Sequence, residues 1–114
     1  MAKAAYMIAG PGNTIFPEGT KLGVIIQCPA CGHAHVPRTA DANDTYPGAQ
    51  PGPVWTFNGD MDKPTFSPSL LVTWGPPENP RKNICHSFVT DGKIQFLTDC
   101  THSLAGQTVD LPDL

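Results

Sequence analysis

The chain has 114 residues, 39% of them apolar, and a formal net charge of −3, which suits one domain with a modest core. The seven basic residues are scattered, apart from the pair Arg81-Lys82. No basic face for a phosphate backbone can be drawn, so we do not expect a nucleic-acid partner. No stretch approaches the eighteen or so apolar residues that cross a bilayer, and we expect a cytoplasmic protein.

Thirteen prolines and eleven glycines predict short strands separated by many turns, so the expected fold class is mainly β. We predict one zinc-binding β domain over residues 1–114, with proline-rich loops at 36–53 and 75–80. In chain order, the expected strands lie within the first ten residues and at 22–27, 54–57, 70–74, 84–89, 94–98 and 109–111, with a helical turn at 100–106.

The clearest local signal is Asp91-Gly92 between two β-rich segments, which predicts a two-residue hairpin turn because a type I′ turn needs positive φ at both central residues. In this register Cys85 lies opposite Thr98. Cys100 then shares the face of Cys85 as its diagonal neighbour, with α-carbons about 7–8 Å apart.

The sharpest motif is Cys28-Pro-Ala-Cys31-Gly32, in which two thiols leave one tight turn. This spacing suits one tetrahedral metal ion, and the glycine favours the left-handed conformation common in such knuckles. In a cytoplasm, cysteines more often mean metal or reactive thiol than disulfide. The knuckle and the hairpin together predict a four-thiolate zinc site from Cys28, Cys31, Cys85 and Cys100.

Several alternatives stay open at this site. His102 is the substitute ligand if Cys100 points away, because the chain leaves the strand at about that point. His33 and His35 share one side of an extended segment, although histidines so close to a knuckle are more often solvated or support the ligands. Without metal, the four cysteines would be small buried side chains, or Cys28 and Cys31 would form a redox pair.

The same hairpin register places His86 and Asp99 together on the face opposite Cys85. A carboxylate beside an imidazole orients the ring and raises its basicity. The pair is therefore a candidate catalytic or binding pair, with an ordinary structural hydrogen bond as the alternative. His102 is the third candidate catalytic residue.

Three segments also resemble a domain-of-unknown-function family of small phage and bacterial proteins, often labelled "ammonia monooxygenase". They are Trp55-Thr-Phe-Asn-Gly-Asp60, Pro64-Thr-Phe-Ser-Pro-Ser69 and the Cys-His…Asp-Gly…Asp-Cys-x-His-x-Leu-Ala-Gly pattern of residues 85–106. The resemblance covers residues 55 to about 112. It implies a phage or prophage origin and a signature cluster of Cys85, His86, Asp99, Cys100 and His102. The label itself is rejected, because that enzyme is a membrane-embedded copper protein.

These observations favour a zinc-stabilised protein-interaction module that acts on an unidentified host protein, and they lean against an enzyme. A closed four-cysteine site would contribute folding energy and no chemistry. The alternatives are a zinc-dependent hydrolase with an open metal position and a cysteine-nucleophile hydrolase using Cys85 or Cys100. The first lacks a His-Glu-x-x-His motif, and in the second Cys85 and His86 would point to opposite faces.

Overall fold

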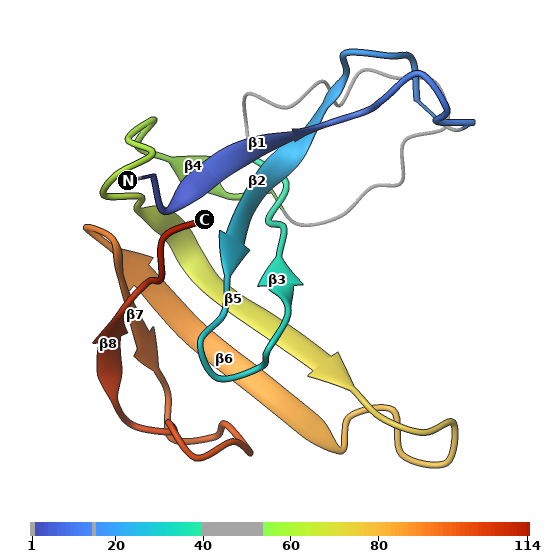
Figure 1. The fold of residues 1–114 in the computed structure, drawn as a ribbon. Helices are drawn as coiled ribbons and strands as arrows, with labels where there is room; N and C mark the ends of the chain where they lie inside the picture. The colour runs from blue at the N-terminus through green and yellow to red at the C-terminus, as the bar shows by residue number, and fades with distance from the viewer. Residues whose placement is uncertain (1, 15, 40–53) are drawn as a thin grey trace.

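The computed structural model describes residues 2–14, 16–39 and 54–114, which fold into two antiparallel sheets (Figure 1). The three-stranded sheet has the order β1-β2-β3, and the five-stranded sheet has the order β4-β5-β6-β7-β8. The described residues contain no helix and hence none long and apolar enough to cross a membrane. The strands are β1 Ala4–Ile8, β2 Lys21–Gln27, β3 Ala34–His35, β4 Thr56–Phe57, β5 Phe66–Trp74, β6 Asn83–Thr90, β7 Lys93–Phe96 and β8 Thr108–Asp110.

The two sheets pack face to face, with β2 and β3 crossing over β5 and β6 (Figure 1). The core between them contains Val24 and Ile26 from β2 and Val89, Ile94 and Phe96 from the hairpin, each with at most 1% of its surface exposed. The predicted small β fold is therefore confirmed. Of the two expected proline-rich loops, residues 75–80 lie in the connection between β5 and β6, whereas residues 40–53 of the other lie outside the described residues.

The β6–β7 hairpin has the predicted two-residue turn. Asp91 has a φ of 51° and Gly92 a φ of 76°, and Thr90 pairs with Lys93. The register then continues as predicted as far as the pair Ser87 and Phe96.

Beyond Phe96 the register departs from the prediction. The Leu97 N–H still donates to the His86 carbonyl, at 2.9 Å, but the next main-chain bond to β6 runs from Thr101 N–H to the Ile84 carbonyl, at 3.0 Å. A turn at Thr98 and Asp99 lies between these bonds and adds two residues to this side of the ladder. The expected pairing of Cys85 with Thr98 is therefore wrong, and the expected helical turn at 100–106 is a series of hydrogen-bonded turns.

Strand β5 contains a bulge that matters for the site. Phe66 pairs with Val89 and Leu70 with Ser87, so residues 67–69 lie opposite a single residue of β6. The Ser67–Pro68 peptide bond within the bulge is cis. Bulges bend a strand and re-aim side chains, and they are frequent beside active sites. Here the bulge sets the direction of Ser69.

Candidate active site and metal centre

Four metal-binding side chains meet on the buried face of β6, where the three-stranded sheet covers it. Cys28 follows β2, Cys31 closes the turn, His35 lies on β3 and Cys85 lies on β6. Their ligand atoms all lie within 4.8 Å of one another. The turn forms as the motif predicts, because Cys31 N–H donates to the Cys28 sulfur at 3.3 Å and Gly32 has a φ of 75°.

The distances in this cluster fit a tetrahedral metal ion. The Sγ atoms of Cys28 and Cys85 lie 3.9 Å apart, and the Cys85 sulfur lies 3.6 Å from His35 Nε2. Around one tetrahedral zinc ion, metal–sulfur bonds of about 2.3 Å and metal–nitrogen bonds of about 2.0–2.1 Å imply separations of about 3.8 Å and about 3.6 Å. The four residues therefore form a candidate metal site of the Cys₃His type.

The thiols of this cluster interact strongly with one another. The pKa of Cys28 is lowered to about 3, chiefly because the Cys85 thiol donates a hydrogen bond to it, and the pKa of Cys85 is raised by the same bond. Burial raises the pKa of Cys31 to about 11. The shared hydrogen bond thus favours a thiolate at Cys28 and a protonated thiol at Cys85.

The structure groups three of the four predicted cysteines and places the fourth elsewhere. The Cys100 sulfur accepts a hydrogen bond from His86 N–H and donates one to the His86 carbonyl, both at 3.2 Å. The two residues added after Phe96 turn this side chain onto the backbone of β6. The substitute ligand His102 packs edge-on against Phe96, with ring centroids 4.5 Å apart, and also lies outside the group of four.

His35 takes the place that the prediction gave to Cys100. It is 5% exposed, and its strand pairs with β2 through Ile26, directly beside the knuckle. His33 is solvent-exposed and packs against the Trp74 ring instead. The sequence signal for His35 was its position four residues after Cys31, which becomes informative only when β3 is known to fold back on β2.

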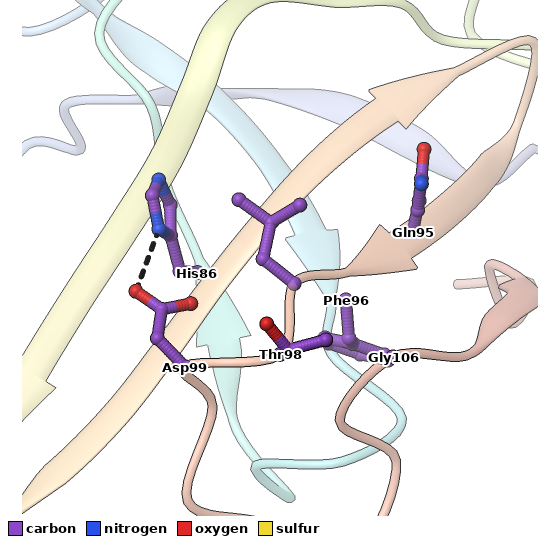
Figure 2. A pocket seen from close by; sticks show the side chains of 7 residues that line it. His86, Gln95, Phe96, Thr98, Asp99 and Gly106 are labelled. Carbon is purple, nitrogen blue, oxygen red and sulfur yellow. Dashed lines mark hydrogen bonds and ion pairs between the residues drawn. The ribbon is translucent and has the colours of Figure 1, made fainter.

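The opposite face of β6 carries the predicted His86–Asp99 pair. His86 Nδ1 lies 3.0 Å from Asp99 Oδ2, with 24% and 52% of the two side chains exposed. Figure 2 shows the imidazole between the carboxylate and strand β5. Asp99 reaches the ring from the turn that follows β7. The contact forms even though the regular register has ended.

Ser69 completes this arrangement and was not singled out from the sequence. Its Oγ lies 3.0 Å from His86 Nε2. The bulge in β5 carries the hydroxyl towards β6, and the Trp55 indole N–H donates to the Ser69 carbonyl at 3.1 Å. Pro68 beside Ser69 is compatible with a bulge, but the sequence does not show which strand pairs with β5, so only the fold brings Ser69 to His86.

Hydrogen bonds connect Ser69 to His86 and His86 to Asp99, as in the catalytic triad of a serine hydrolase. With Nδ1 protonated and donating to Asp99, Nε2 is free to accept the Ser69 proton, while the carboxylate fixes the ring and stabilises its positive charge. A pocket of about 420 Å³ lies on the Asp99 side of the ring; it is lined by His86, Gln95, Phe96, Leu97, Thr98, Asp99 and Gly106. This arrangement is typical of the serine-hydrolase class.

The comparison with protein families agrees with that class. Residues 7–97 match the family model described as "Bacterial ubiquitination-like system serine protease (BubE)", which covers more than half of the chain. The chain belongs to this family. Comparison with the curated proteins and with the solved structures gives no significant match.

The family match corrects the predicted function and confirms part of the predicted family resemblance. The expectation of a non-enzymatic interaction module is wrong, because the family is one of serine proteases. The alternative, a zinc-dependent or a cysteine-nucleophile hydrolase, agrees better in that it is also a hydrolase. The resemblance to a small bacterial domain family is confirmed, whereas the "ammonia monooxygenase" label and the signature cluster of residues 85–102 are not. The phage origin, the cytoplasmic location and the host-protein partner stay predictions.

Proposed function

We propose that this chain is a serine peptidase in which Ser69 is the nucleophile, His86 the general base and acid, and Asp99 the residue that orients the imidazole. The observation that carries the proposal is the continuous pair of hydrogen bonds, Ser69 Oγ to His86 Nε2 and His86 Nδ1 to Asp99 Oδ2, both 3.0 Å long. The family description supports the same class.

The residues divide the reaction into two steps. Ser69 Oγ attacks the scissile carbonyl carbon while its proton passes to His86 Nε2 and the carbonyl electrons move to oxygen. When the intermediate collapses, the C–N bond breaks and the amine leaves with the proton from Nε2. Water then attacks the acyl-serine ester with His86 as base, which releases the acid and restores Ser69. Asp99 stays ionised throughout and stabilises the imidazolium.

The metal centre has a structural role in this proposal, and we assign zinc to it. Three cysteines and one histidine complete a tetrahedral shell, so no protein-built position is left open for water. Cys28, Cys31, His35 and Cys85 would hold the ion, which supplies folding free energy by joining the β2–β3 knuckle to β6. A zinc-activated water and a nucleophilic Cys85 are therefore disfavoured, and Cys100 contacts the backbone of His86, not its imidazole.

The substrate class follows from the family. Because its description places the protease in a ubiquitination-like system, we propose that this chain cleaves a peptide or isopeptide bond of a ubiquitin-like protein or its conjugates. The triad is compatible with both bonds, since each has an acyl carbon for Ser69 and an amine to protonate.

Covalent labelling tests the nucleophile directly. Purified protein is treated with a fluorophosphonate and its mass is measured intact, and peptide mapping then finds the modified residue. We expect one adduct, on Ser69, and no adduct after Ser69→Ala. Ser67→Ala is the matched control, because Ser67 lies in the same bulge with an exposed side chain. Labelling that persists in Ser69→Ala, or no labelling of the folded parent, would overturn the assignment.

A further inference from the structure

The edge of β5 that continues from Ser69 has main-chain groups without strand partners among the residues that the structure describes. Strand β4 pairs with β5 only at Phe66 and Ser67. Within residues 2–14, 16–39 and 54–114, the segment of β5 from Leu70 to Trp74 is paired on one side only, with β6. The free side therefore begins where the nucleophile is placed.

The hydrogen bonds of β6 determine which main-chain N–H and C=O groups of β5 point towards β6 and which point to the free edge. The His86 carbonyl accepts from Leu97 on the β7 side, so the neighbouring residues Cys85 and Ser87 direct their N–H and C=O groups to β5. Alternate residues of a strand point to opposite sides. Val72 and Leu70, the partners of Cys85 and Ser87, hence bond to β6.

Leu71 and Thr73 consequently direct their N–H and C=O groups to the open edge. The Ser69 carbonyl points the same way, because the Trp55 indole N–H reaches it from the β4 side. Across residues 2–14, 16–39 and 54–114, the main-chain groups of Leu71 and Thr73 have no hydrogen-bond partner. Such an edge is a template for an added strand.

Side chains beside the edge suit an extended peptide. Leu71 is 47% exposed and Phe88 is 43% exposed, on the same sheet face as His86, which pairs directly with Leu71. A small cavity of about 90 Å³ lies along this edge on the inner face of the sheet. It is lined by His35, Val36, Pro37, Trp55, Leu70, Leu71 and Val72. Because side chains of a strand alternate, one residue of an added strand would enter this cavity while its neighbours lie on the outer face.

We propose that the substrate binds as an extended strand on the β5 edge, hydrogen-bonded to the main chain of Leu71 and Thr73, with a small apolar side chain in the cavity beside Val36. The proposal rests on the proposed function of Ser69 and adds the mode of substrate binding to it. An added strand runs about 4.8 Å from β5 and reaches Ser69 two residues before Leu71. Affinity comes from the main chain, and sequence preference comes from the cavity.

Proline at position 73 tests the main-chain contact. Thr73→Pro removes an N–H that points to the free edge and leaves the bonds of Val72 and Trp74 to β6 in place, a position at which strands tolerate proline. Thr73→Val keeps the N–H and is the matched control. The substrate probe is a peptide digest of a bacterial lysate, with cleavage read by mass spectrometry, and fluorophosphonate labelling reports Ser69 separately.

We expect Thr73→Pro to cleave the peptide mixture at least about fivefold more slowly, as the loss of one hydrogen bond requires, with unchanged fluorophosphonate labelling, while Thr73→Val resembles the parent. Normal cleavage by Thr73→Pro would overturn strand addition. Absence of labelling in the parent would instead overturn the role of Ser69, so the two failures are distinguishable.

A second measurement covers the case in which Thr73→Pro fails to fold. One cleaved peptide is resynthesised with each backbone amide replaced in turn by an ester, which removes one N–H at a time. With the parent protein, we expect the loss of cleavage rate to alternate with a period of two residues. In addition, Val36→Ala, which widens the cavity, should relax the preference at one substrate position. No alternation would overturn the proposal.

Discussion

Cys85 and His86 are consecutive residues of β6 whose side chains serve opposite faces of one sheet. The Cys85 sulfur lies 3.6 Å from His35 Nε2 in the buried metal cluster, and the His86 ring joins Ser69 to Asp99 on the outer face. Because successive side chains of a strand point to opposite sides, one short segment contributes to the candidate metal site and also holds the proposed catalytic base.

Replacing Asp99 tests the orienting carboxylate. We expect Asp99→Asn to lower kcat by about 10³–10⁴-fold, because an amide no longer holds the imidazole tautomer or stabilises its charge. The melting temperature should change little, since the Asp99 side chain is 52% exposed. Peptide hydrolysis and thermal unfolding measure the two effects. Thr98→Ala, in the same turn, is the control, and a fall in kcat below tenfold for Asp99→Asn would contradict the triad.

Replacing Trp55 tests how Ser69 is positioned. Trp55→Phe keeps the ring and removes the indole N–H that bonds the Ser69 carbonyl at 3.1 Å. One hydrogen bond of this kind is worth about 1 kcal/mol, so we expect kcat to fall about fivefold with little change in KM. Steady-state kinetics show this split, and an unchanged kcat would mean that the bulge holds Ser69 without Trp55.

Two substitutions decide the ligands of the metal. We expect His35→Ala to lower the zinc content well below one ion per chain and to destabilise the fold, because one of four ligands is removed. Cys100→Ala should retain one zinc per chain, since its sulfur bonds only the main chain of His86. Elemental mass spectrometry of the purified variants gives the answer. The opposite result would restore Cys100 as the fourth ligand.

Removing the metal should abolish activity through the fold. A structural zinc site of this kind contributes an apparent binding free energy of about 10–16 kcal/mol, which exceeds the whole stability of many domains of this size. We expect a strong chelator to lower the melting temperature steeply and to stop fluorophosphonate labelling of Ser69, with both restored by added zinc. Labelling that survives complete metal removal would show that the triad assembles without the cluster.

The sequence predicted the parts of this protein that depend on local signals. Asp91-Gly92 predicted the hairpin and its register as far as Phe96. The predicted contact between His86 and Asp99 also forms, although Asp99 reaches the ring from a turn beyond that register. The sequence also predicted the turn that holds Cys28 and Cys31, which the structure contains. What failed was the register beyond Phe96, because a turn that adds residues at Thr98 and Asp99 carries no distinctive residue type. The predicted position of Cys100 depended on this register and was therefore wrong as well.

Two further features needed the tertiary structure. Ser69 reaches His86 because β5 bulges opposite Phe88, and a bulge depends on how two distant strands pair. His35 joins the cysteines because β3 folds back on β2, although a two-residue strand gives almost no sequence signal. The expectation of a binding module followed from these omissions: without Ser69 the His86–Asp99 pair had no nucleophile.

The three triad residues all lie within residues 69–99, on β5, β6 and the turn that follows β7, so consecutive hairpins bring them together. Closing such short loops costs little chain entropy. The four candidate metal ligands, by contrast, come from residues 28–85 and connect the two sheets. The proposed triad is thus local in sequence, whereas the candidate metal site behind it depends on the docking of both sheets.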